Sequence, residues 1–216
     1  LTQCSGNISV VAANMFLPEI ISLVHGWRHA SWYLSLLGFT LAIGLFLIVK
    51  TRPKAIQVTS TQVAQSTVSI SQLFKILLTN QQFWIVTLFA GLLLGSLFNL
   101  GANWDISFQK SFSGNTLSSA ALINSIMFLG LAVGNPLMGI LSGKLKSRRK
   151  LLVTGSLSAA ILLGVLLFAP QLNHAAAMVL YFGFGLCCST AVLSYTVIME
   201  VLPAEVQGVG IGVCNT

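Results

Sequence analysis

Long apolar segments separated by short polar stretches run along the whole chain. A membrane-spanning helix needs roughly 20 consecutive apolar residues, and six segments are long enough. These segments are 4–24, 30–49, 83–103, 117–141, 151–169 and 175–199. A seventh apolar segment begins near residue 208 and runs to the last residue. The pattern predicts an all-α fold, a polytopic transmembrane helix bundle, and we expect the chain to be an internal part of a longer protein.

Composition agrees with a membrane protein. Of 216 residues, 55% are hydrophobic and 7% are charged, whereas a soluble domain has roughly 25% charged residues. The net charge of +7 would also suit a nucleic-acid-binding protein. However, the basic residues lie between apolar segments and form no continuous basic face. We therefore expect the lipid bilayer, and no nucleic acid, as a partner.

One polar stretch, 50–82, is longer than the others and is rich in Ser, Thr and Gln. It is expected to be a cytoplasmic loop that joins two helix bundles. Within it, apolar residues around Lys75 predict a short interfacial helix over 71–78. The expected organisation is two spans in 1–49, the loop, and a second bundle in 83–216.

Basic residues indicate the orientation of the spans. Successive spans alternate in direction, and Lys and Arg gather in cytoplasmic loops. One group of loops holds nine basic residues, namely Lys50, Arg52, Lys54, Lys75, Lys144, Lys146, Arg148, Arg149 and Lys150. The other group holds only Arg28 and Lys110. Cytoplasmic loops are therefore expected at 50–82, 142–150 and 200–207, and external loops at 25–29, 104–116 and 170–174.

Pairs of glycines four residues apart predict close helix contacts, because small residues let two backbones approach. Such pairs are Gly91 and Gly95, Gly130 and Gly134, and Gly139 and Gly143. They favour a tightly packed bundle but do not indicate a function.

Four features follow one another in a distinctive order. A Gly-Trp-Arg turn at 26–28 precedes the second span, which contains Trp32 and is followed by the long polar loop. A Gly139-x-x-x-Gly143-Lys144 stretch with Arg148-Arg149-Lys150 follows the fourth span, and Glu200-x-x-Pro203-x-x-x-x-Gly208 follows the sixth. The order and spacing resemble the fifth to eleventh helices of the major facilitator superfamily, over nearly the whole chain.

The resemblance implies alternating access, in which two bundles rock about a site near the bilayer midplane. It assigns the third, fourth and sixth spans to the transport cavity and the fifth span to the lipid. Two positions depart from the family pattern: Gly143 stands where Asp is usual, and Gln207 stands where Arg is frequent. The missing carboxylate weakens the expectation of a full charge lock at this loop.

Polar residues within the cavity-lining spans are candidates for the substrate pathway, because polar side chains facing lipid are costly. The candidates are Asn99, Asn103, Asp105, Asn124, Tyr181 and Tyr195. Asn99 and Asn103 are four residues apart and share a helix face, and Asp105 is expected just beyond the helix at the external mouth. The alternative is that these groups only form hydrogen bonds between helices.

Glu19 is a candidate for proton coupling. An acidic residue within a membrane span is a functional hypothesis by default, and Glu19 lies only about 8–9 Å from the external turn at 1.5 Å per residue. It could take up a proton from outside. The alternative is that it reaches the interface or pairs with Arg28, His25 or His29.

Charged residues at the cytoplasmic ends predict an inner gate. The gate candidates are Gly139, Lys144, Arg148, Arg149, Glu200 and Glu205. Glu200 or Glu205 could pair with an arginine when the transporter faces outward. The alternative is a set of exposed ion pairs, which contribute only about 0–1 kcal/mol each.

The leading functional prediction is proton-coupled import of a small polar metabolite, such as an amino acid. The stretches 101–105 and 126–136 resemble bacterial nutrient-uptake members of the family. We expect the complete protein to be a monomer in the bacterial inner membrane. Proton-antiport efflux of a drug or metabolite, and a solute sensor that transports nothing, are the alternatives. The sequence has no phosphate-binding loop, metal-ligand spacing or nucleophile motif, so we expect neither an enzyme nor a cofactor.

Overall fold

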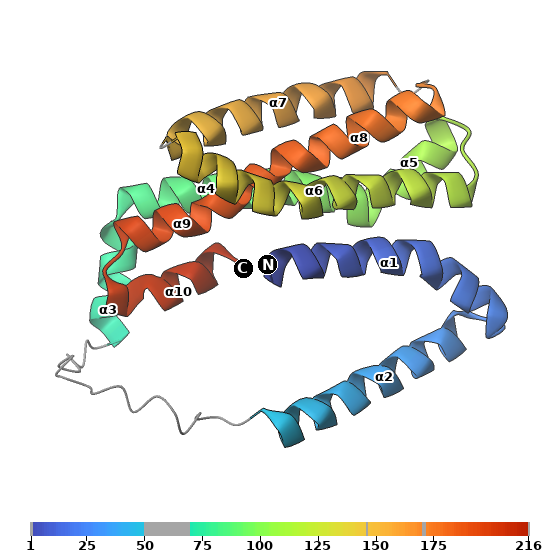
Figure 1. Cartoon of the computed structure of the whole chain (residues 1–216), viewed down its shortest axis with the longest axis horizontal. Coiled ribbons are helices and arrows are strands. Elements are labelled where there is room, and N and C mark those ends of the chain that lie inside the picture. The colour runs from blue at the N-terminus through green and yellow to red at the C-terminus, as the bar shows by residue number, and fades with distance from the viewer. Residues whose placement is uncertain (1, 50–69, 146, 170–171, 216) are drawn as a thin grey trace. The chain divides into compact units, whose positions relative to one another are not determined.

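The computed structural model describes residues 2–49, 70–145, 147–169 and 172–215, and the regular structure in these ranges is helical (Figure 1). Within these ranges, six helical runs are long and apolar enough to cross a membrane. These runs are Gln3–Leu23, Trp27–Ile48, Gln81–Phe112, Leu117–Leu145, Arg148–Phe168 and His174–Val201. The predicted polytopic helical fold is confirmed.

Contacts divide the chain into two compact units, one formed by Leu1–Met15 with Ser69–Thr216 and the other by Phe16–Val68. The division into 1–49, 50–82 and 83–216 expected from the sequence stays a prediction. Lys50, Arg52, Lys54 and Lys146 lie outside the described residues.

The smaller unit holds the end of α1 (Thr2–Leu23) and all described residues of α2 (Trp27–Ile48). The turn between these helices is shorter than predicted, because Trp27, Arg28 and His29 already belong to α2. Gly26 makes this tight reversal possible with φ 138°, a conformation that side chains with a Cβ rarely adopt.

The larger unit contains the remaining helices. They are α3 (Ile70–Thr79), α4 (Gln81–Phe98), the π-helix η1 (Asn99–Trp104), α5 (Asp105–Phe112), α6 (Leu117–Leu145), α7 (Arg148–Phe168), α8 (His174–Cys188), the 3₁₀ turn η2 (Ser189–Ala191), α9 (Val192–Val201) and α10 (Ala204–Cys214). The short helix expected before the third span is present as α3. At the start of α4, Asn80 Oδ1 accepts a hydrogen bond from the Phe83 amide (2.9 Å) and caps the helix.

Two expected loops are largely helical. α4, η1 and α5 form one helical run, so the external loop predicted at 104–116 begins only after Phe112. The prediction was wrong because polar residues were taken as the end of the span, whereas two of them, Asp105 and Gln109, are buried. Likewise, Arg148, Arg149 and Lys150 form the first turn of α7, as the high helix propensity of Arg and Lys permits.

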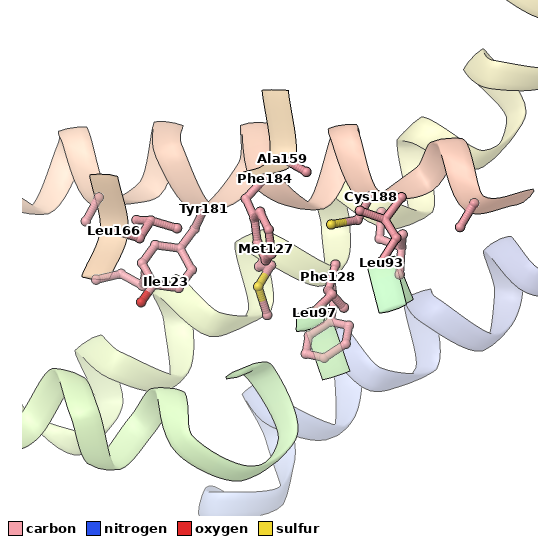
Figure 2. Close-up of a cluster of buried hydrophobic side chains, with 13 residues drawn as sticks. Leu93, Leu97, Ile123, Met127, Phe128, Ala159, Leu166, Tyr181, Phe184 and Cys188 are labelled. Carbon is pink, nitrogen blue, oxygen red and sulfur yellow. The ribbon is translucent and has the colours of Figure 1, made fainter. Parts of the chain in front are cut away.

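The core of the larger unit lies where α6 and α8 cross, with α4 and α7 beside them (Figure 2). Ile123, Met127 and Phe128 of α6 pack against Tyr181 and Phe184 of α8. All five side chains are buried. This packing holds the polar residues of α6 and α8 in a defined register.

Glycines set the distance between α6 and α8. A Cβ at Gly130 would collide with the Phe182 carbonyl, and one at Gly185 with the Met127 carbonyl. The close contact predicted for Gly130 and Gly134 is therefore confirmed. For the other two pairs the predicted contact is absent among the described atoms, so the prediction was wrong there. A Cβ built at any of their four glycines meets no heavy atom within 4 Å.

We expect Gly185→Ala to destabilise the larger unit, because the added methyl group would meet rigid backbone. Overpacking of this kind costs about 1–3 kcal/mol, and thermal unfolding in detergent would measure it. Gly91→Ala is the matched control, as it lies in a helix with open space around the new Cβ. Equal unfolding midpoints for the two variants would contradict the close approach of α6 and α8.

Candidate functional site

Asp105 lies at the centre of the most buried polar cluster in the described part of the chain. It is the first residue of α5 and is 0% exposed. Its amide donates to the Leu100 carbonyl, five residues back, which closes the π-helical turn η1. The expected position just beyond the helix was wrong, whereas the position at the external mouth stays a prediction. The helix continues past Trp104, and its wider turn places Asp105 against α6 and α8.

Three neutral groups donate hydrogen bonds to the Asp105 carboxylate. Tyr181 OH donates to Oδ1 (2.5 Å), and Oδ2 accepts from Asn124 Nδ2 (2.9 Å) and Gln109 Nε2 (2.9 Å). The donors come from α8, α6 and α5. A carboxylate that accepts several hydrogen bonds can remain stable away from water.

Asn124 extends this cluster towards α1. Its Nδ2 also donates to the Gly101 carbonyl (2.7 Å), while its Oδ1 accepts from Asn14 Nδ2 (3.1 Å). Asn14 belongs to the part of α1 that packs within the larger unit. We call Asp105, Gln109, Asn124, Tyr181 and Asn14 the Asp105 network.

The other end of the network approaches the loop after α5. Asn115 Nδ2 donates to Gln109 Oε1 (3.2 Å). A cavity of about 20 Å³ lies beside Gln109, Asn115 and Tyr181. This space is sufficient for one water molecule, which needs roughly 10–15 Å³ and polar partners.

The structure brings three of the six pathway candidates together and leaves three elsewhere. Asp105, Asn124 and Tyr181 form the network. Asn99 and Asn103 share a helix face as predicted, but they are exposed and bond to each other (Asn103 Nδ2 to Asn99 Oδ1, 3.1 Å).

Tyr195 lies apart from both groups. Its hydroxyl donates to Asn215 Oδ1 (3.0 Å), and its side chain borders a cavity of about 10 Å³ with Gln3 and Asn135. The pathway role of each candidate stays a prediction.

Sequence reasoning missed Gln109 and Asn14. Gln109 follows Asp105 by four residues, so the pair shares one face if the helix is extended to Phe112. Asn14 follows the buried Asn7 by seven residues, which places both on one side of α1. A polar pair at helical spacing was the available signal in each case.

Glu19 is exposed on the part of α1 that belongs to the smaller unit. Its backbone carbonyl accepts a hydrogen bond from Ser22 Oγ (2.7 Å). Its proposed part in proton coupling stays a prediction.

Arg148 and Glu200 form an ion pair between the start of α7 and the end of α9. Their side chains are 30% and 57% exposed. Arg148, Arg149 and Glu200 also line a cavity of about 820 Å³. The remaining gate candidates, Gly139, Lys144 and Glu205, are exposed. Their gating role stays a prediction, as does that of the arginines and Glu200.

The described residues offer no group of three or more His, Cys, Asp or Glu side chains that could hold a metal ion. The chemistry of the Asp105 network is instead that of one carboxylate among neutral hydroxyl and amide groups. Such a cluster can bind a proton or contact a small polar molecule.

Comparison with known proteins identifies the family. A protein-family model described as Major Facilitator Superfamily matches residues 1–216. No curated protein and no solved structure matches the chain. Together with six apolar helices of membrane-spanning length, this match makes the protein an integral, multi-pass membrane protein. The chain belongs to the major facilitator superfamily, whose members are secondary transporters.

Proposed function

We propose that the protein imports a small polar metabolite, such as an amino acid, together with protons, by alternating access. The observation that carries this proposal is the Asp105 network, a buried carboxylate held only by neutral donors within the membrane-spanning part of the chain. Ionisable groups at such positions commonly belong to substrate or proton pathways.

The chemistry of the candidate pathway supports a small polar substrate. Asn99, Asn103 and Tyr195 offer neutral hydrogen-bonding groups, and such groups suit polar or zwitterionic molecules better than bulky cationic drugs. Glu19 remains a second candidate for the proton carrier. We further propose that the protein acts as a monomer in a bacterial inner membrane.

The inner gate is proposed to close through the ion pair of Arg148 with Glu200. The pair links α7 to α9 at the predicted cytoplasmic end, where Arg149 also borders the cavity. An ion pair with partly exposed side chains stabilises weakly, so it can form and break within each transport cycle.

Uptake into liposomes tests the proposed function. The full-length transporter is reconstituted with a pH-sensitive dye inside, and amino acids and other small metabolites are added outside. We expect internal acidification with one class of solute, because a symported proton enters with each substrate. Release of a preloaded drug or metabolite, driven by an inward proton gradient and without solute-dependent acidification, would instead indicate efflux. Solute binding without any movement would indicate a sensor.

Charge reversal tests the gate. We expect Glu200→Arg to favour the inward-open state by up to about fivefold, since an exposed pair contributes at most about 1 kcal/mol. A cysteine introduced at Ser142, which borders the same cavity, would then be alkylated faster in a background without other cysteines. The double variant Arg148→Glu with Glu200→Arg restores the opposite charges and should restore slow alkylation. Unchanged alkylation in the single variant would refute the gate.

A further inference from the structure

The arrangement of hydrogen bonds defines which way the Asn124 amide points. The Gly101 carbonyl can only accept, so Asn124 must direct Nδ2 towards it, at 2.7 Å. The same Nδ2 also donates to Asp105 Oδ2. Asn124 Oδ1 is therefore the group that faces α1, where it accepts from Asn14 Nδ2. One amide side chain thus connects Asp105 to α1.

The two oxygens of Asp105 differ in their capacity to take up a proton. Oδ2 already accepts from two amide nitrogens, Asn124 Nδ2 and Gln109 Nε2, neither of which can accept in return. Among the described residues, Oδ1 accepts from the Tyr181 hydroxyl alone, and this hydroxyl can rotate from donor to acceptor. A proton is therefore accommodated at Oδ1, and Tyr181 then accepts from it.

A small cavity lies beside Tyr181, the hydrogen-bond partner of Oδ1. The cavity of about 20 Å³ borders Tyr181, Gln109 and Asn115 near the loop after α5. A single water molecule there could reach polar groups of the network.

The net charge of this site is set by whether Asp105 carries a proton, because its hydrogen-bond partners are neutral. Tyr181 of α8 is the titratable group that contacts it, and α6 and α1 present the amides of Asn124 and Asn14. On its own helix, Lys110 is exposed. No described Lys, Arg or His forms an ion pair with Asp105. A bound proton is thus the simplest way to neutralise the carboxylate in the membrane.

We propose that Asp105 is a proton-binding site and that Asn124 is the positioning residue through which its proton changes the contact between α1 and α6. This inference rests on the proposed proton-coupled uptake and assigns the coupling to specific groups. Hydrogen bonds to an ionised acceptor are about twice as strong as those between neutral groups. Binding a proton at Oδ1 therefore weakens the bond from Asn124 Nδ2 to Oδ2. Asn124 is then held less firmly, and the bond that its Oδ1 accepts from Asn14 loosens.

Infrared spectroscopy tests the proton site without transport. The full-length transporter in lipid nanodiscs is titrated, and we expect a protonated-carboxyl band to appear on acidification. Asp105→Asn should remove this band, and Glu19→Gln should leave it. Tyr181→Phe keeps the carboxyl group but should shift the band's frequency, because the partner of Oδ1 is lost. Persistence of the full band in Asp105→Asn, or an unshifted band in Tyr181→Phe, would overturn the assignment.

Spin-label distances test the part assigned to Asn124. Labels on α1 and α6 should report a distance that changes over the same pH range as the carboxyl band. Asn14→Ala should abolish this response because it removes the bond to Asn124. Asn7→Ala is the matched control, because Asn7 is also a buried asparagine on the same side of α1. Its Nδ2 has no hydrogen-bond partner in the part of the chain that the structure describes. A pH response that survives in Asn14→Ala, or is lost equally in Asn7→Ala, would overturn the proposal.

These two measurements require no substrate. They can therefore fail while proton-coupled uptake succeeds, which would place the coupling at another residue such as Glu19. Conversely, uptake without proton movement would refute the proposed symport even if Asp105 binds a proton.

Discussion

A carboxylate inside a helix bundle in the membrane must obtain its hydrogen bonds from the protein, because the lipid interior supplies none. Asp105 meets this requirement with donors from α5, α6 and α8. Its position depends in turn on the π-helical turn η1 and on the close crossing of α6 and α8 at Gly130 and Gly185. The packing of apolar side chains and the polar site are therefore parts of one arrangement.

The membrane-spanning segments could be predicted from the sequence because lipid demands long apolar runs. The end of the third span could not. Asp105, Gln109 and Lys110 read as an external loop, yet two of these three residues are buried. Their burial depends on partners such as Asn124 and Tyr181, which are far away in the sequence. Local polarity indicates where water is expected, and tertiary hydrogen bonds can replace that water.

Candidate residues show the same limit. Asn124 and Tyr181 could be selected one helix at a time, since each is polar in an apolar span. Asp105, their common partner, was also a candidate, but its buried position in the fold was not predicted. The glycine pairs are equally instructive, because Gly91 with Gly95 has the same spacing as Gly130 with Gly134 and yet faces open space. Spacing indicates that a close contact is possible, and the neighbouring helix decides whether it forms.

The two polar features of the larger unit differ in how firmly they are held. The ion pair of Arg148 with Glu200 is partly exposed and contributes at most about 1 kcal/mol. The Asp105 carboxylate is fully buried, and leaving a buried polar group without its partner costs about 1–3 kcal/mol, or more when it is charged. The proposed transport cycle uses both kinds of contact. The proposed inner gate would have to open readily in every cycle, whereas the proposed proton site would have to stay assembled until it binds a proton.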